Sequence, residues 1–490
     1  MSATSDPGCL FMFGIYGKRA TRQTVQLLRD TGASSVLLLA RNIESPAQVR
    51  RLTRELAQKV GRPLLFAIDH EGGWVLRFTS GVTAFPGNAA LGRAKDPRLA
   101  YAVGRQMALE LSAMGIGLNL APVLDVATSR YNPGIGIRSF GTDPKLVARL
   151  GTAFIRGLQD HGVAACAKHF PGKGAATVDA HVALPTIRLP EVELLRTHVA
   201  PFAAAARAGV CSLMTSHARC LAFDKKPATF SRHIVHDLIR KRLRFDGAVI
   251  SDDLCMGAIT SRGPVPAAAW SAWEAGHDIL MIAHEPMAQR EAVELFRARL
   301  ARQDFDESRL RIERLSSFQK RSRAANPAAG VRLAREIAQK SVELIRQGTL
   351  SLPLIKGKKT VVLFPDFSEV KERFAFENGF RGPEAFVSKA LGARLIRTPI
   401  ESSDLGLIPD ALRQADQVVF FCFEARRFAG QRAVLRLLNR EAPRRSAVCL
   451  MRSPFDLDLL DGRVTVIDSR GYRLCQLEAA LELILDKEKP

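Results

Sequence analysis

Eight short apolar runs alternate with longer segments of helical periodicity over about the first 300 residues. The runs are Phe11–Ile15, Val36–Ala40, Leu64–Ile68, Ile116–Leu120, Val163–Ala167, Val210–Thr215, Ala248–Ile250 and Ile279–Ile282. They are continuous rather than alternating, which is typical of parallel strands covered on both faces. The segments between them place apolar residues at three- and four-residue steps, as in Val293, Phe296 and Leu300. The predicted helices are Thr21–Asp30, Pro46–Val60, Pro97–Met114, Pro144–Asp160, Pro190–Ala208, Ser231–Arg242, Val265–Ala275 and Met287–Arg302.

Eight strands that are each followed by a helix predict an α/β fold, a (β/α)8 TIM barrel. A doubly wound open sheet is the alternative, and the count of eight favours the barrel. We assign residues 1–320 to a TIM-barrel catalytic domain.

The rest of the chain predicts a smaller α/β sandwich domain. The segment RSRAANPAAG at 321–330 has a linker composition, and a helix is expected over Val331–Gln347. Residues 321–350 therefore form a linker and connecting helix, and 351–490 form the C-terminal domain. Its predicted strands are Thr360–Phe364, Gln417–Phe423, Ala447–Met451 and Val464–Ile467, and its predicted helices are Pro383–Leu391, Pro409–Gln414 and Cys475–Leu485.

The chain is strongly basic, because 71 Lys and Arg residues against 49 Asp and Glu residues give a net charge of +22. Such a charge is compatible with nucleic acid, an anionic membrane or a polyanionic substrate as partner. No nucleic-acid recognition motif accompanies it, and no apolar stretch approaches the length of a membrane span. We therefore expect neither partner and assign most of the charge to a solvated surface. The oligomeric state is left open.

Cysteine usage and the N-terminal segment favour a cytoplasmic enzyme without a metal. The eight cysteines include no CxxC pair and are too few for a disulfide scaffold. The first apolar run follows Asp6 and precedes Lys18, which is the wrong charge order for an export signal. We expect a reducing compartment and no zinc, other metal or cofactor.

Titratable side chains follow five of the runs, and in a barrel the carboxyl ends of the strands carry the active site. They are Asp69-His70-Glu71, Asn119 with Asp125, Lys168-His169, Ser216-His217 and Ser251-Asp252-Asp253. A lone aspartate after a strand is also commonly a helix cap, and this interpretation stays open for Asp125 and Asp253. The gathering of so many charges at one end of the barrel predicts a catalytic site.

These residues suit retaining glycoside hydrolysis. Asp252, placed directly after a buried strand, has the short and rigid carboxylate expected of a nucleophile. In Asp179-Ala180-His181 the aspartate is able to fix the tautomer of the histidine, which could then donate and accept the proton. The groups expected to bind sugar hydroxyls and an acetamido group are Asp69, Arg77, Arg138, Lys168 and His169.

Several segments resemble the bacterial β-N-acetylglucosaminidase (β-hexosaminidase) branch of glycoside hydrolase family 3, in the family's order and spacing over roughly residues 10–300. They are GASSVLLLARNI, FAIDHEGGWVLRF, IRSFGTDP, KHFPGKGAATVDAHVALP and VISDDLCMGAI. The segments REIAQKSVELIRQGTLSLPL and LMRSPFDLDLL resemble the second domain of two-domain members. The resemblance implies Asp252 as nucleophile, His181 as acid/base and Asp179 as its partner. It implies that the five binding residues named above hold N-acetylglucosamine at the non-reducing end.

Four positions depart from the pattern that the resemblance implies. The family usually has His at Lys173 and Ser at Ala180, and commonly has Gln at His70 and Arg at Trp74. A cation at Lys173, close to His181, would lower the pKa of that imidazole and shift the activity optimum toward acid. None of the four removes a group that makes or breaks a bond.

The leading hypothesis is a retaining exo-β-N-acetylglucosaminidase that acts on muropeptides in cytoplasmic peptidoglycan recycling. The first alternative is a phosphorylase, because a neutral histidine would tolerate a phosphate that a glutamate acid/base would repel. The second is a non-catalytic protein that binds sugar or nucleic acid, which the charge suggests and the intact catalytic residues oppose.

Overall fold

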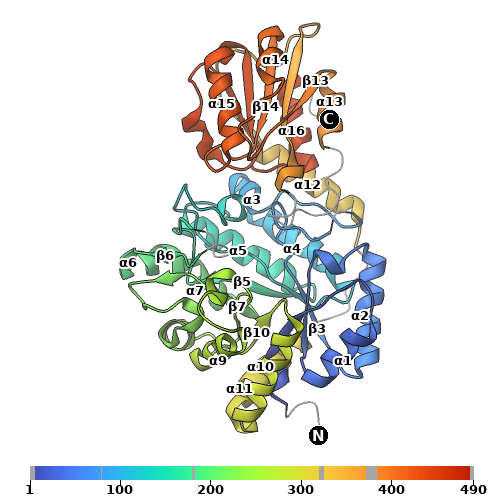
Figure 1. The fold of residues 1–490 in the computed structure, drawn as a ribbon, viewed down its shortest axis with the longest axis vertical. Helices are drawn as coiled ribbons and strands as arrows, with labels where there is room; N and C mark the ends of the chain where they lie inside the picture. Colours follow the sequence, from blue (N-terminus) through green and yellow to red (C-terminus); the bar gives the residue numbers. More distant parts are fainter. Residues whose placement is uncertain (1–5, 79, 179–182, 319–324, 371–382, 486–490) are drawn as a thin grey trace.

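The computed structural model describes residues 6–78, 80–178, 183–318, 325–370 and 383–485 (Figure 1). Its two larger sheets lie in two α/β units, with the smaller unit stacked on one end of the larger, and a third sheet pairs the short strands β6 (Thr186–Ile187) and β8 (Arg219–Cys220). This arrangement confirms the predicted fold class. No helix within the described ranges is long and apolar enough to cross a membrane.

The larger unit is an eight-stranded parallel barrel. Its strands are β1 (Phe11–Gly14), β2 (Ser35–Leu38), β3 (Leu65–Ile68), β4 (Leu118–Asn119), β5 (Ala164–Phe170), β7 (Ser212–Thr215), β9 (Ala248–Ile250) and β10 (Leu280–Ile282). They pair in the order β10-β1-β2-β3-β4-β5-β7-β9. A parallel bridge between Ile250 and Ile279 joins the last strand to the first. Each of the eight apolar runs therefore supplies one strand, and the open-sheet alternative is set aside.

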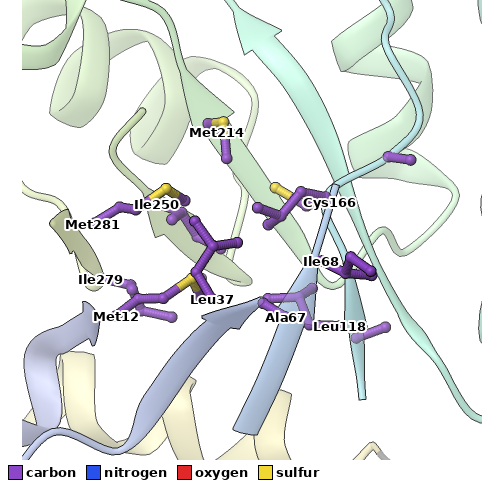
Figure 2. Packing of buried hydrophobic residues seen from close by; sticks show 14 of the residues in the cluster. Met12, Leu37, Ala67, Ile68, Leu118, Cys166, Met214, Ile250, Ile279 and Met281 are labelled. Carbon is purple, nitrogen blue, oxygen red and sulfur yellow. The ribbon is translucent and has the colours of Figure 1, made fainter. Parts of the chain in front are cut away.

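The inner surface of the barrel is packed with side chains. Figure 2 shows these side chains converging from different strands, and they are all buried: Met12, Leu37, Ala67, Ile68, Leu118, Cys166, Met214, Ile250, Ile279 and Met281. Interdigitated side chains fill a barrel of this size and leave no pore. Chemistry is therefore confined to the rim, where loops follow the strands.

Capping residues, prolines and glycines in the local sequence determine where the helices around the barrel begin and end. Helix α2 (Pro46–Val60) shows this well: the Ser45 hydroxyl accepts a hydrogen bond from the Gln48 N–H at 3.2 Å, Pro46 occupies the first turn, and Gly61 ends the helix with φ 84°. The other long helices are α1 (Arg22–Thr31), α4 (Pro97–Ser112), α5 (Pro144–Gln159), α7 (Ala200–Arg207), α9 (Val265–Ala275) and α10 (Pro286–Arg299). Two π-helical segments, Leu194–Val199 and His233–Arg242, lie where α-helix was predicted. The apolar pattern did not indicate α3 (Asn88–Ala94) or α11 (Asp306–Ser317).

The smaller unit is a six-stranded mixed sheet covered by helices. Strands β12 (Thr360–Pro365), β13 (Arg394–Thr398), β14 (Gln417–Cys422), β15 (Ser446–Leu450) and β16 (Thr465–Asp468) are parallel, and β11 (Glu343–Arg346) pairs antiparallel with β16. Its helices are α13 (Pro383–Leu391), α14 (Ile408–Gln414), α15 (Ala429–Glu441) and α16 (Leu474–Leu485). The four predicted strands and three predicted helices are all present, within one or two residues at each end.

The predicted helix Val331–Gln347 is wrong at both ends. Helix α12 spans Pro327–Ser341, because the Asn326 side chain accepts a hydrogen bond from the Ala329 N–H and Pro327 suits the first turn. The end of the supposed helix is strand β11, whose pairing with β16 outweighs helical periodicity. Part of the proposed linker is therefore helical, and residues 321–324 lie outside the described ranges. The domain boundaries at 320 and 351 remain predictions.

Candidate active site

The carboxyl ends of the barrel strands bring together the predicted binding residues that the structure describes. Asp69 follows β3, Lys168 and His169 lie in β5, and Arg138 belongs to the long loop after β4. Arg77 reaches Asp69 from the loop after β3, with its Nη2 atom 3.3 Å from Asp69 Oδ2. These side chains come from β5 and from the loops after β3 and β4, and they lie at one rim.

An ion-pair network of five groups forms the centre of the site. The Lys168 Nζ atom lies 2.6 Å from Asp69 Oδ1 and 2.7 Å from Glu71 Oε1. Arg138 donates two hydrogen bonds to Glu71, from Nη2 to Oε1 at 2.7 Å and from Nε to Oε2 at 2.9 Å. This geometry is the bidentate fork that makes arginine–carboxylate pairs strong and directional. The site therefore presents fixed donors and acceptors of the kind that sugar hydroxyls require.

Both carboxyls of the network are ionised. Burial favours the neutral form of Asp69, but Lys168 and Arg77 hold its pKa well below its usual value. Burial likewise opposes the charge of Glu71, and Arg138 and Lys168 lower the pKa of that carboxyl to about 2. Lys168 is itself only 2% exposed, and the two carboxylates raise the pKa of its ammonium despite its burial.

Glu71 was not among the predicted site residues, although it follows Asp69 by two positions. Its main partner, Arg138, is 67 residues away in the chain. The signal available in the sequence was a second acidic residue at the same strand end, two positions after Asp69.

Asp125 orients the imidazole of His169. Its carboxylate is fully buried, and Oδ2 lies 2.7 Å from His169 Nδ1 while Oδ1 accepts a hydrogen bond from the Lys173 N–H at 2.6 Å. Burial lowers the pKa of His169 well below its usual 6.5, so the ring is neutral. We therefore assign the ring proton to Nδ1, which leaves a lone pair on Nε2. Asp125 caps no helix, and sequence reasoning left its role undecided.

Asp252 follows β9 and is held by the neighbouring turn. Its Oδ1 atom accepts a hydrogen bond from the Asp253 N–H at 2.9 Å. Burial opposes the ionised form, yet Lys173 and His217 hold the pKa of Asp252 below its usual value. The carboxylate is therefore charged at neutral pH and available as a nucleophile.

Asp253 and His217 support this turn. Asp253 Oδ1 accepts hydrogen bonds from the N–H groups of Cys255 and Ala283, at 3.1 and 3.0 Å. This role is close to the capping interpretation left open for Asp253. His217 Nε2 lies 2.8 Å from the Asp253 carbonyl oxygen. His217, which was noted at a strand end but not chosen, lies beside the nucleophile candidate.

The predicted acid/base pair, Asp179 and His181, lies outside the described residues, so its role remains a prediction. The segment that leads to it is anchored: the Lys173 and Gly174 carbonyl oxygens both accept hydrogen bonds from Asn132 Nδ2, at 2.7 and 3.1 Å. Among the described side chains, no group of three His, Cys, Asp or Glu residues is arranged to hold a metal ion. All eight cysteines are free.

The smaller domain contacts two of the loops that carry the site. Arg473 Nε donates to the Gly73 carbonyl oxygen at 2.6 Å, and Arg427 Nη1 donates to the Pro133 carbonyl oxygen at 2.7 Å. Trp74 stacks on Phe423, with the ring centroids 5.8 Å apart, and the Arg452 guanidinium carbon lies 3.8 Å from the Trp74 ring centroid. The contacted loops contain Glu71 and Arg138.

The comparisons with known proteins agree with this architecture. The family model described as glycosyl hydrolase family 3 N terminal domain matches residues 8–315. A β-hexosaminidase of Neisseria meningitidis serogroup C is 37% identical over 304 residues, which cover 61% of this chain and 84% of that protein. A β-hexosaminidase of Bordetella avium is 37% identical over 297 residues, covering 58% and 85%.

Two solved structures extend the comparison to the whole chain and to the barrel. A glycoside hydrolase family 3 β-N-acetylglucosaminidase from Paenibacillus superposes with a TM-score of 0.91 at 32% identity, covering 99% of this chain and 97% of that one. NagZ from Neisseria gonorrhoeae in complex with N-trifluoroacetyl-D-glucosamine has a TM-score of 0.60 at 31% identity, covering 68% of this chain and 98% of that one.

Proposed function

Because this chain belongs to glycosyl hydrolase family 3, we propose that it is a retaining exo-β-N-acetylglucosaminidase. The resemblance inferred from the motifs is thereby confirmed at the level of the family and of its β-hexosaminidase relatives. The chain is a glycoside hydrolase.

The observation that carries the proposal is the placement of Asp252 opposite the ion-pair network. In the ring of eight strands, β3 and β9 are four strands apart and therefore face each other across the barrel. Asp69 and Glu71 follow β3, and Asp252 follows β9. A single sugar ring that spans the rim could thus hydrogen-bond to the network at one end and present its anomeric carbon to Asp252 at the other.

The reaction proposed is a double displacement. The ionised Asp252 carboxylate attacks the anomeric carbon and forms a glycosyl ester, while His181 protonates the leaving oxygen. Water then attacks the same carbon with His181 acting as base, and Asp252 leaves. Asp179 would hold the imidazole in the tautomer that both steps require.

The network supplies binding and orientation. Asp69 accepts hydrogen bonds from sugar hydroxyls, and Lys168 and Arg138 donate to hydroxyl or carbonyl oxygens. The neutral His169 ring, fixed by Asp125, offers Nε2 as an acceptor. Because burial and ion pairing hold these groups in place, little orientation entropy is lost when a substrate binds.

For the natural substrate we propose muropeptides from peptidoglycan recycling, cleaved in the cytoplasm. The net charge of +22 supports an anionic substrate, since a positive protein field raises the local concentration of such ligands. Binding of N-acetylglucosamine at the non-reducing end agrees with the ligand named for the Neisseria gonorrhoeae structure.

The test compares hydrolysis of an aryl N-acetylglucosaminide with that of an aryl glucoside. We expect a strong preference for the former, and loss of turnover in Asp252→Ala. A matched control is Asp143→Ala, which removes an exposed carboxylate that caps helix α5 far along the chain from the nucleophile. Undiminished turnover by Asp252→Ala would refute the mechanism. Preference for the aryl glucoside would assign the chain to another branch of the family.

Phosphorolysis is the second candidate, favoured by the position of Lys173. The positive charge of Lys173 helps to lower the pKa of Asp252, and a cation that acts on the proposed nucleophile would also attract phosphate. Initial rates with and without phosphate, together with a search for sugar 1-phosphate, decide between the two. A rate that phosphate leaves unchanged, with free sugar as product, identifies a hydrolase.

A further inference from the structure

A cavity of about 330 Å³ lies between the two domains. Its barrel wall consists of residues 89–95, in and after helix α3, and of residues in the segment 127–146. Its other wall consists of residues in the loops after β14, β15 and β16, and Figure 1 shows α3 between the barrel and the smaller domain. Neither Asp252 nor any member of the ion-pair network lines the cavity. The cavity is therefore separate from the candidate active site.

The size and the position of this interdomain cavity are typical of a ligand site. Ligand pockets in proteins measure roughly 300–1,000 Å³ and often lie between domains. In the smaller domain the parallel strands pair in the order β13-β12-β14-β15-β16, so the chain order reverses between β12 and β14. Doubly wound sheets with such a reversal bind ligands outside the carboxyl ends of their strands. The cavity lies at that edge of the sheet.

Backbone strain is concentrated at the interdomain cavity. In the described part of the chain, five residues other than glycine have a positive φ, and three of them line the cavity. They are Lys95, Glu424 and Arg470, with φ values of 55°, 54° and 53°. Glycine adopts this left-handed conformation without the cost that a side chain adds, and residues held in it cluster at ligand clamps and switch regions. Charged side chains at three such positions indicate that the side chains themselves have a role in the cavity.

The lining of the interdomain cavity is rich in cations. Five of the lining residues are Arg or Lys and two are Asp or Glu, namely Arg93, Lys95, Arg130, Arg452, Arg470, Asp143 and Glu424. Three of the arginines pair with carboxylates that do not line the cavity, those of Glu343, Asp458 and Asp468. Each ion pair occupies only part of the five N–H groups of a guanidinium. The Lys95 ammonium has no hydrogen bond or ion pair in the described part of the chain. The lining therefore offers the charge-assisted donors that bind phosphate and carboxylate groups.

The barrel wall of the cavity belongs to the loop that holds Arg138. Ile137 and Ser139 line the cavity and flank Arg138 in the chain, and the Arg138 guanidinium holds Glu71 in the network. The Ser139 hydroxyl also donates to the Asp125 carbonyl oxygen at 2.6 Å. A ligand that contacts this wall would therefore restrain the loop that positions two groups of the candidate active site.

We propose that the interdomain cavity binds a small anionic molecule about the size of a monosaccharide, and that its binding strengthens sugar binding at the active site. The phosphate or carboxylate of the ligand would accept hydrogen bonds from Lys95 and the lining guanidiniums. Its carbon skeleton would contact the apolar part of the lining, which includes Ile137, Leu146 and Phe455. A ligand that restrains the loop lowers the ordering cost of sugar binding. Binding in the cavity does not depend on the proposed glycosidase activity, whereas the coupling concerns the same sugar site.

The experiment is a calorimetric titration of the full chain with three compounds of similar ring size: glucose 6-phosphate, glucuronate and glucose. We expect at least one of the two anions to bind about ten-fold or more tightly than glucose, since it forms a charge-assisted hydrogen bond. Tighter binding of glucose 6-phosphate assigns the cavity to phosphate esters, and tighter binding of glucuronate assigns it to carboxylates. Equal binding of all three compounds, or binding of none, would overturn the proposal.

Lys95→Gly separates the role of the side chain from that of the backbone. Glycine suits a φ of 55°, so the melting temperature should stay the same or rise while the affinity for the preferred anion falls about ten-fold. Lys95→Gln, which removes only the charge, should lose a similar part of the affinity. The matched control is Lys358→Gln, which removes an exposed ammonium just before β12, at the amino edge of the same sheet. It should bind like the wild type. Equal losses in the Lys95 and Lys358 variants would show that the anion responds to the overall charge and would overturn the assignment to the cavity.

N-acetylglucosamine tests the coupling and the location together. Because coupling between two sites is reciprocal, saturating N-acetylglucosamine should tighten binding of the anion about five-fold, and the anion should tighten binding of N-acetylglucosamine by the same factor. Weaker anion binding in its presence would place the anion in the active site and overturn the proposal. Unchanged affinities would refute the coupling alone. If the chain hydrolyses no N-acetylglucosaminide but the Lys95 variants still weaken anion binding, the proposed reaction fails and the cavity assignment stands.

Discussion

Replacing Glu71 with Gln tests how strongly the ion-pair network stabilises the fold. The substitution keeps the shape of the side chain but removes the charge that faces Lys168 and Arg138. A pKa of about 2, against the ordinary 4.5, corresponds to about 3 kcal/mol at neutral pH. Removing one member of a buried pair costs a similar amount, about 3–5 kcal/mol. We therefore expect Glu71→Gln to lower the free energy of unfolding by about 3 kcal/mol.

The sign of the pH dependence follows from the same shift. Because folding lowers the pKa of Glu71, its stabilisation is fully present above the unfolded value near 4.5 and is lost as the pH falls toward about 2. The difference in free energy of unfolding between the wild type and Glu71→Gln should therefore become smaller as the pH falls over this range. Denaturant unfolding at several pH values measures it, wherever the wild type still folds reversibly.

Glu110→Gln is the matched control. Glu110 is also buried, but among the described residues its carboxylate accepts hydrogen bonds only from neutral groups, namely the Thr83 N–H and hydroxyl and the Gln106 amide. Glu110→Gln should lower the free energy of unfolding by about 1 kcal/mol. The reasoning is refuted if Glu71→Gln costs no more than Glu110→Gln, or if its cost does not decrease in acid.

Three further outcomes are expected. Asp125→Asn loses one of the two acceptor oxygens that hold the His169 imidazole and the Lys173 N–H. On an aryl N-acetylglucosaminide, kcat should therefore fall about ten- to a hundred-fold, with little change in melting temperature. Arg473→Gln removes the hydrogen bond from the smaller domain to Gly73, and KM should rise about two- to ten-fold. The control Arg445→Gln loses a hydrogen bond to a carbonyl within the smaller domain and should leave KM unchanged. Burial raises the pKa of Asp456 to about 7. The contribution of this carboxyl to stability is therefore present at low pH and lost as the pH rises toward 7. The melting temperature should decline over this range in the wild type and decline less in Asp456→Asn.

The barrel could be predicted because the local sequence carries its signals. Continuous apolar runs marked all eight strands, and prolines with capping residues marked helix starts such as that of α2. Once the strands were placed, Asp69, Lys168 and Asp252 followed at their carboxyl ends. Parallel strands bring those ends to one rim whatever the loops do.

The partners of these residues could not be predicted, because they depend on contacts between distant segments. Glu71 gains its role from Arg138, and Asp125 from His169, 44 residues away. The hydrogen bond from Arg473 to Gly73 joins residues 400 positions apart. Spacing in the sequence carries no information about such distances. The strand β11 was missed for the same reason, since its pairing with β16 decides its conformation.

The central claim is that Asp252 forms a covalent bond to the sugar, and trapping that bond tests it most directly. A fluorinated N-acetylglucosaminyl fluoride, which slows hydrolysis of the intermediate, is added to the protein, and the adduct is located by mass spectrometry of peptides. We predict one fluorosugar per chain on the peptide containing Asp252, and none on Asp252→Ala. An adduct on another residue, or turnover with inversion and without any adduct, would contradict the account.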